Sequence, residues 1–228
     1  MTMPARRFAT VLAGVVLSLA TLPALALEPF TADYQARYMG MSGNGRMTLE
    51  RQGAGRWKYT LNIQAAVGSL TQVTVFEDHA GGWRPLSGTD ASLLLVKKIR
   101  RNAVYDWGAG QARWSGDVKP ERAGPVALQP GDMDGLLINL AVVRDAAAGK
   151  PLRYRLVDDG RAKPMVFTVA GTETVTVAGK AHQATRAVYR NGDKEMIVWV
   201  VAAYPMPVRI LQRKDGKDDI DLRMTGVR

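Results

Sequence analysis

The sequence predicts an all-β, mainly antiparallel protein: a curved meander sheet or open half-barrel, with one helix against its concave face or end. Short stretches rich in β-branched and aromatic residues recur along most of the chain, separated by glycine-containing turns. No helical pattern alternates with these stretches, so a parallel sheet is not favoured. A single segment has apolar residues at helical spacing, which gives the fold its one helix.

The first 26 residues have the three parts of a secretory signal peptide. Arg6 and Arg7 supply the positive start, an apolar stretch follows, and Ala24-Leu25-Ala26 is a small-residue cleavage site. We expect cleavage after Ala26 and a single domain over 27–228. The chain has no cysteine for a lipid anchor or a disulfide, which favours a bacterial periplasm. An uncleaved membrane anchor over 8–27 is the alternative, and no later stretch is apolar for long enough to span a membrane.

The first half of the mature chain is expected to form successive hairpins. Asn44-Gly45 suits a type I′ turn, so the first hairpin is placed around 43–45. The stretch 56–66 alternates apolar and polar residues, which is typical of a strand with one buried and one wet face. The expected strands are 31–39, 46–52, 56–66, 70–76, 83–86, 92–96, 99–107 and 111–114.

One helix is expected at about 132–147. Asp132 is available as its N-cap and Gly149 follows its end. The residues at helical spacing, which should face the sheet, are Met133, Leu136, Leu137, Leu140 and Val143.

Strands resume after this helix, and the last four should form one continuous meander. Hairpin signals at Asn191-Gly192 and Asp215-Gly216 support this expectation. Pro205 and Pro207 should end one strand and open the next, which makes 204–207 a rim of the sheet. The expected strands are 152–157, 165–170, 173–177, 182–189, 196–202, 208–214 and 219–224.

Three motifs of this second half belong together: an acidic helix start, a Val-x-Val-x-Gly-Lys turn, and a tryptophan strand joined through proline to a Val-Arg strand. They are Asp132-Met133-Asp134-Gly135, residues 175–180, and Val198-Trp199-Val200 before Pro207-Val208-Arg209-Ile210. This order resembles the bacterial family of domains of unknown function numbered 3108 (DUF3108). The last hairpin is also similar to one in periplasmic lipoprotein carriers. The resemblance covers most of 31–228 and implies an exported, curved antiparallel β-sheet, but it implies no catalytic residue.

The residue inventory argues against most catalytic chemistries. The chain has no cysteine and two histidines, His79 and His182, each of which is explained by a solvated strand end. No Gly-x-Ser-x-Gly nucleophile elbow occurs. The acidic turn 215–221 lacks the spaced ligands of a calcium loop. We therefore expect no catalytic residue, no metal and no cofactor.

A basic cluster beside an apolar run is the main binding candidate. Removal of the signal peptide takes out Arg6 and Arg7 and lowers the formal charge from +10 to +8. The mature chain is still basic, and in a periplasm this charge favours anionic envelope partners, such as lipid headgroups, over nucleic acid. The cluster follows the apolar run 93–96, and aromatic residues near the proline rim complete the site. The candidate ligand-binding residues are Lys97, Lys98, Arg100, Arg101, Trp199 and Tyr204. The alternatives are an edge strand whose charges prevent aggregation, and tryptophans that only fill the core.

Three hypotheses follow. The first is a non-enzymatic periplasmic protein that binds an anionic or amphiphilic, lipid-like ligand in the curved sheet, and it predicts an elongated apolar cavity. The second is a structural or protein-interaction module of the envelope, with a filled core and an envelope protein as partner. The third is an enzyme that uses carboxylates, and it predicts at least two acidic side chains that converge in a pocket. The carboxylates cluster at turns: Asp132 and Asp134, Asp158 and Asp159, and Asp218, Asp219 and Asp221.

Overall fold

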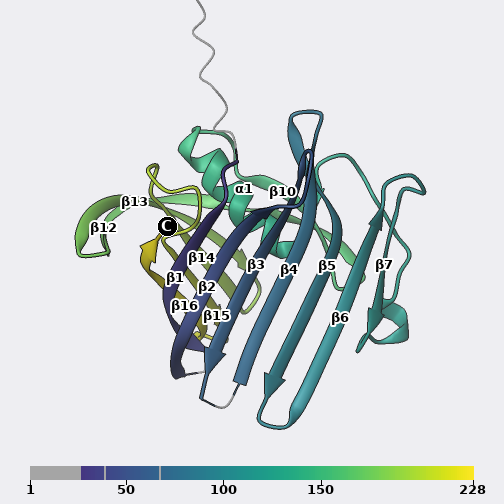
Figure 1. Cartoon of the computed structure of the whole chain (residues 1–228), viewed down its shortest axis with the longest axis horizontal. Helices are drawn as coiled ribbons and strands as arrows, with labels where there is room; N and C mark the ends of the chain where they lie inside the picture. Colours follow the sequence, from purple (N-terminus) through teal and green to yellow (C-terminus); the bar gives the residue numbers. More distant parts are fainter. Residues whose placement is uncertain (1–26, 39, 67) are drawn as a thin grey trace, which may run out of the picture.

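The computed structural model describes residues 27–38, 40–66 and 68–228. Most of them belong to one 13-stranded open sheet with the order β12-β13-β14-β15-β16-β1-β2-β3-β4-β5-β6-β7-β8. All neighbouring strands in it are antiparallel, and it curves around one α-helix (Figure 1). The predicted fold class is therefore confirmed. The predicted signal peptide, with its cleavage site after Ala26, lies outside the described residues.

The elements follow one another with short turns. The first meander consists of β1 (Phe30–Tyr38), β2 (Met41–Arg51), β3 (Arg56–Ala65), β4 (Gly68–His79), β5 (Gly82–Leu94), β6 (Lys97–Asp106) and β7 (Gln111–Gly116). A 3-10 helix, η1 (Pro120–Arg122), and β8 (Val126–Ala127) come next. A small three-stranded sheet follows, which consists of β9 (Asp132–Met133), β10 (Arg153–Asp158) and β11 (Arg161–Val166). The α-helix, α1 (Gly135–Ala147), lies between β9 and β10 in the chain. The second meander consists of β12 (Thr168–Val177), β13 (Lys180–Asn191), β14 (Lys194–Val200), β15 (Arg209–Lys214) and β16 (Lys217–Val227).

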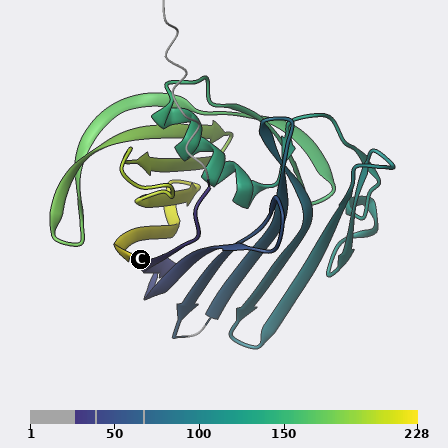
Figure 2. The same cartoon turned by 45° about the horizontal axis from the view of Figure 1, so that its top comes forward.

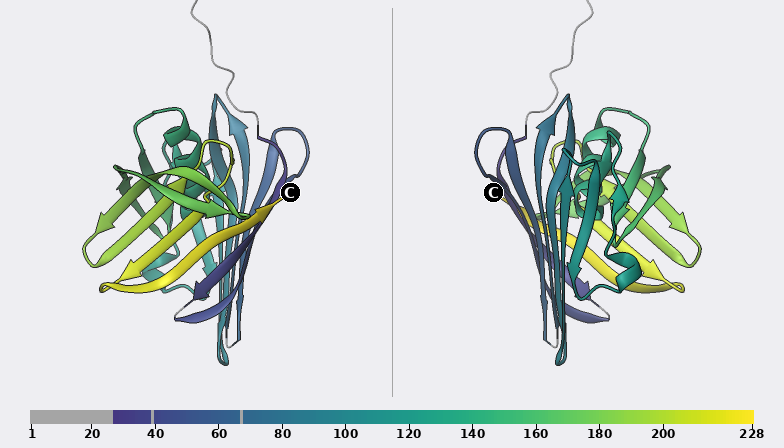
Figure 3. Two further views of the ribbon diagram at one scale, coloured as in Figure 1. Left: turned by 90° about the vertical axis from the view of Figure 1, so that its left-hand side faces the viewer. Right: turned by 90° about the vertical axis from the view of Figure 1, so that its right-hand side faces the viewer.

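The sheet has two walls that meet where the first and last strands pair. Strands β1 and β16 are antiparallel partners, from Ala32 opposite Val227 to Tyr38 opposite Ile220. A register shift between Asp33 and Tyr34 interrupts this ladder, and such bulges bend a sheet. Figure 3 shows the wall of β1–β5 nearly edge-on and the wall of β12–β16 leaning away from it.

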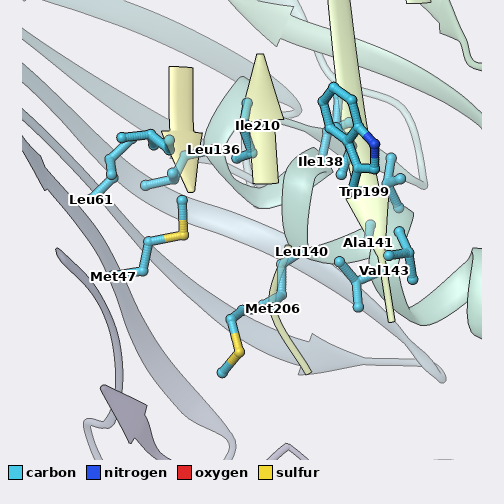
Figure 4. Packing of buried hydrophobic residues seen from close by; sticks show 14 of the residues in the cluster. Met47, Leu61, Leu136, Ile138, Leu140, Ala141, Val143, Trp199, Met206 and Ile210 are labelled. Carbon is cyan, nitrogen blue, oxygen red and sulfur yellow. The ribbon is translucent and has the colours of Figure 1, made fainter. Parts of the chain in front are cut away.

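Helix α1 fills the concave side between the walls. It contacts β3 and β4 on one wall and β13 and β14 on the other (Figure 2). Figure 4 shows Leu136 and Leu140 of α1 among Met47, Leu61, Ile210 and Met206. These side chains belong to one buried cluster that joins both walls and the helix. Burial of this apolar surface is the main contribution that stabilises the packing of α1 between the two walls.

The start of the helix differs from the sequence expectation. Asp134, not Asp132, is the N-cap, and its Oδ1 accepts a hydrogen bond from the backbone N–H of Leu137 at 2.8 Å. Asp132 lies in β9 instead, where its Oδ2 accepts a 2.5 Å bond from Arg155. Asp132 and Met133 form the parallel pairing of β9 with β10, so the helix begins later. The predicted end is confirmed, because Gly149 follows the helix with a φ of 64°.

One predicted turn and one predicted strand were wrong. Residues 43–45 lie inside β2 rather than in a turn, because Gly43 pairs with Ala36 and with Ala65 in the middle of the sheet. The predicted strand 92–96 ends early, since the chain turns at Leu95 and Val96, and β5 begins far before it. The last four strands form the expected meander, and 204–207 connects β14 to β15 as predicted.

Candidate functional site

The predicted basic cluster lies on the hairpin of β5 and β6. Leu94 pairs with Lys97, so the turn consists of Leu95 and Val96 alone. Side chains alternate across a strand, which places Lys98 and Arg100 on the convex face and Lys97 and Arg101 on the concave face. The structure therefore divides the four cations between two faces of one hairpin.

The tip of this hairpin is both apolar and basic. The exposed fraction is 69% for Leu95 and 94% for Val96, the two largest values among the exposed large apolar residues of the described chain. Within the same described ranges, no ion pair involves the side chain of Lys97, Lys98 or Arg100. We call residues 95–98 together with Arg100 the β5–β6 tip.

The backbone of the tip is strained for its residues. Leu95 has a φ of 54°, in the left-handed region that bulky residues avoid. In the turns at 80–81, 159–160, 178–179 and 215–216 the residue with positive φ is followed by a glycine, whereas Leu95 is followed by Val96. Of the two turn residues only Leu95 has a positive φ, so the turn holds two exposed apolar side chains where glycine at the first position would be the stable choice. Strain that is retained in this way points to a function of the side chains.

A shallow hollow of about 460 Å³ lies beside the tip, between it and the turn from β3 to β4. Its apolar lining includes Ala66, Leu93 and Leu95, and its polar lining includes Gln64 and Ser69. Lys98 is the cross-strand partner of Leu93 and lies on the same face. An apolar surface with a cation at its border is the arrangement that suits an anionic amphiphile.

Trp199 lies on the other wall, away from the tip. It is 3% exposed, its Nε1 donates to Oε1 of Glu173 at 2.5 Å, and the guanidinium of Arg209 stacks over its ring at 4.4 Å. Arg209 in turn makes two hydrogen bonds to the buried carboxylate of Asp221. These bonds, with those from Arg223, hold the pKa of Asp221 below its usual value although its burial acts in the opposite direction. Trp199 thus joins β12, β14 and β15.

Tyr204 lies in the proline connection of that same wall. Its ring meets His182 edge-on at 5.4 Å. A hydrogen bond from β1 holds this connection in place: the hydroxyl of Tyr34 donates to the carbonyl oxygen of Pro207 at 2.7 Å. Several strands separate β6 from β14 in the sheet, so the structure does not bring Trp199 and Tyr204 together with the basic tip.

Arg101 belongs to a second feature, a small polar cavity on the concave face that the sequence did not reveal. The cavity has a volume of about 30 Å³ and lies where the small sheet and the start of α1 meet β4–β7. Carboxylates from three elements line it: Asp90 of β5, Asp134 before α1 and Asp158 of β10. The guanidinium of Arg101 reaches past the cavity to Asp159, with which it forms a 3.0 Å ion pair.

The pKa values of two of these carboxyl groups, Asp134 and Asp158, are raised. Burial raises the pKa of Asp134 to about 7, against the hydrogen bond that its Oδ2 accepts from Thr74 at 2.6 Å. Burial and the neighbouring carboxylate of Asp90 raise the pKa of Asp158 to about 6. The indole N–H of Trp114, which also lines the cavity, is buried without an acceptor.

The cavity has room for about one water molecule and for no larger substrate. Acidic side chains do converge here, as the carboxylate-enzyme hypothesis predicted, but a sugar or peptide would not fit between them. No group of three or more potential metal ligands occurs in 27–38, 40–66 and 68–228. We interpret the cavity as a structural feature: polar side chains line it where the small sheet and the helix pack against the main sheet.

Of the helices that the structure describes, none has the length and apolar character needed to cross a bilayer.

A family model described as "Protein of unknown function (DUF3108)" matches residues 30–223. Among solved structures, the fold is similar to a β-barrel-like protein of the domain of unknown function DUF1849 from Brucella abortus, with a TM-score of 0.54 and 14% sequence identity over 88% of this chain and 97% of that chain. The MucA/MucB complex of Pseudomonas aeruginosa contains a chain with a TM-score of 0.39 and 11% identity, over 88% of this chain and 51% of that chain. No curated protein matches the sequence.

Proposed function

This chain belongs to the DUF3108 family of proteins of unknown function, and we propose that it is an exported, non-enzymatic periplasmic protein that binds an anionic lipid surface through its β5–β6 tip. In this proposal residues 1–26 are the signal peptide and 27–228 the mature domain. The observation that carries the proposal is the apolar turn Leu95-Val96, exposed and strained, followed directly by Lys97 and Lys98.

The tip has the composition of a surface-binding loop. Leu95 and Val96 enter the boundary between headgroups and acyl chains, where burial of each apolar side chain contributes about 1.5–3 kcal/mol. Lys97, Lys98 and Arg100 then lie at the level of the phosphates, where each cation contributes about 1 kcal/mol near an anionic surface. The adjacent hollow beside Leu93 receives part of an acyl chain or headgroup.

The packing of the core favours a binding site on the surface over a site enclosed by the curved sheet. The concave face is filled by the side chains of α1 and both walls, whereas a carrier cavity would need that space. The same filled core favours a second candidate function, an envelope module that binds a protein and no small molecule. The two candidates differ in whether vesicles without any protein bind the chain.

The test is flotation of the mature chain, 27–228, with vesicles of phosphatidylethanolamine and phosphatidylglycerol, compared with vesicles of phosphatidylcholine alone. The proposal expects binding to the anionic vesicles only. Replacing Lys97, Lys98 and Arg100 by glutamine should weaken it roughly a hundredfold, since about 3 kcal/mol of attraction is removed. The matched control, with Lys180, Lys194 and Lys217 replaced by glutamine, loses the same charge from exposed positions on the other wall and should bind with little change.

A second variant separates binding from folding. Leu95→Gly with Val96→Asn places glycine where φ is positive, as a type II′ turn favours, so it should keep or raise the stability of the fold while removing the apolar tip. We expect this variant to be folded and to lose vesicle binding. Equal binding by this variant, or no binding of the unchanged chain to anionic vesicles, would refute the proposal.

A further inference from the structure

Strand β12 presents a free edge in the part of the chain that the structure describes. This strand ends the 13-stranded sheet, and Figure 1 shows it at the outer margin, away from β6 and β7. The opposite edge strand, β8, has two residues, so it offers little to pair with. Thr172, Thr174 and Thr176 are exposed. A long exposed edge is a template for another strand, and proteins usually protect such edges with lysine, proline or a bulge.

The pairing with β13 determines which peptide groups of β12 are free. Val177 pairs with Lys180 across the two-residue turn Ala178-Gly179, whose φ values of 48° and 77° are those of a type I′ hairpin. Residues that flank such a turn exchange both hydrogen bonds, and the pattern alternates from there. Hence Val177, Val175 and Glu173 bond to β13, while the N–H and C=O groups of Thr172, Thr174 and Thr176 point to the free edge.

This edge lacks the usual protection over 172–176. A register shift between Val169 and Thr172, with Gly171 at a φ of 96°, bends the strand before this segment. The segment itself contains no lysine, arginine or proline. Its one charged residue, Glu173, is already engaged by the indole N–H of Trp199 and by Arg186 at 3.6 Å.

The segment is complementary to itself. We propose that β12 pairs antiparallel with β12 of a second copy, about a two-fold axis at Thr174, so that the two sheets become one continuous sheet. Thr172 then lies opposite Thr176, and Thr174 lies opposite its own copy. Every outward peptide group finds a partner, and threonines meet threonines on one face, which is a favourable cross-strand pair.

The charges also permit this pairing. In the same register Glu173 lies opposite Val175, so like charges do not meet across the interface. Each mature copy carries a net charge of +8 by the sequence count, and this long-range repulsion opposes association. Salt screens such repulsion, so the dimer should become stronger as ionic strength rises. An interface formed by ion pairs would respond in the opposite direction.

Sedimentation equilibrium of the mature chain, 27–228, at low and high salt tests the proposal. We expect a reversible dimer whose dissociation constant falls with added salt. Thr174→Pro removes an outward N–H without breaking a bond to β13, and Thr174→Lys adds a charge at the edge; each should weaken the dimer at least tenfold. Gln183→Lys is the matched control, because Gln183 is the cross-strand partner of Thr174 but lies on the interior strand β13. It adds the same charge and should leave the dimer nearly unchanged.

Cysteine pairing gives an independent readout, since the natural chain has no cysteine. Thr174→Cys should form a disulfide-linked dimer on mild oxidation, whereas Gln183→Cys, one strand further from the axis, should not. A chain that stays monomeric at both salt concentrations would overturn the proposal. So would a dimer that Thr174→Pro and Thr174→Lys leave intact, or a monomer whose β12 edge takes up an extended segment of another protein.

Discussion

The hydroxyl of Thr74 donates a hydrogen bond to Oδ2 of Asp134 at 2.6 Å, and this bond ties the start of α1 to the middle of β4. The other oxygen of the same carboxyl group caps the helix through the N–H of Leu137. One buried side chain thus fixes both the first turn of the helix and its place on the sheet. Asp90, Asp158, Arg101 and Tyr105 surround this carboxyl across the small cavity.

Stability should fall as the pH rises from about 4 to about 7 because of Asp134. Its pKa is raised to about 7 in the folded protein, so the native state keeps a proton that the unfolded chain releases near its usual value of 3.8. The free energy of unfolding therefore decreases between these two values, and the burial cost of the charge is complete above about pH 7. Asp158, with its pKa raised to about 6, contributes in the same direction.

Asp134→Asn should raise stability at about pH 8 by roughly 2 kcal/mol or more, and change it little at about pH 4. Asparagine is as good an N-cap as aspartate, and its amide can donate to the hydroxyl of Thr74. Urea unfolding at the two pH values measures this effect. A variant that is less stable at pH 8 would show that the ionised carboxylate is favoured in place. Asp117→Asn, at an exposed residue, serves as the control.

The two arginines at Asp221 should contribute unequally. Arg209 bonds both carboxylate oxygens and stacks on Trp199, and its side chain is 22% exposed. Arg223 bonds one oxygen only and is 58% exposed. We expect Arg209→Gln to lower the free energy of unfolding by about 2 kcal/mol, and Arg223→Gln by less than about 1 kcal/mol. Chemical denaturation at neutral pH compares them, and equal losses would contradict the account.

Gly43 and Gly45 should resist substitution because of close packing. A Cβ at Gly43 would lie 2.1 Å from the backbone oxygen of Gln64, which cannot move without disturbing β3. A Cβ at Gly45 would meet Leu222 and Tyr34 at 3.0 Å and 3.2 Å. Gly43→Ala should therefore cost about 3 kcal/mol or more and Gly45→Ala about 1–2 kcal/mol. Thermal unfolding tests this ranking, with Gly226→Ala, where a Cβ meets no atom within 4 Å, as the neutral control.

These glycines also show why part of the fold was misread from the sequence. Asn44-Gly45 is a strong turn signal on local grounds, and nothing local reveals that a neighbouring strand approaches too closely for a side chain. The opposite error occurred at Leu95-Val96, which has the composition of a strand but forms a turn. The alternating strands and the apolar stripe of α1 were predictable, because burial of one face imposes the period of each element.

The candidate sites were predictable to different degrees. Charge and adjacency identified the basic run after residue 96, but strand alternation divides its cations between two faces. The cavity carboxylates Asp90, Asp134 and Asp158 come from separate elements, so only the tertiary structure brings them together. Trp199 was selected as an aromatic ligand contact, and the structure gives it partners on its own wall.

Insertion of Val96 into an anionic bilayer is the most direct test of the account. Because the chain has no cysteine, Val96→Cys can carry a single environment-sensitive fluorophore at the tip. Val169→Cys, at a residue 56% exposed on β12, is the matched control. With vesicles containing phosphatidylglycerol, we predict a blue shift and a gain of fluorescence at position 96, no change at position 169, and loss of the signal at high salt. An unchanged spectrum at position 96, or equal changes at both positions, would contradict the proposed function.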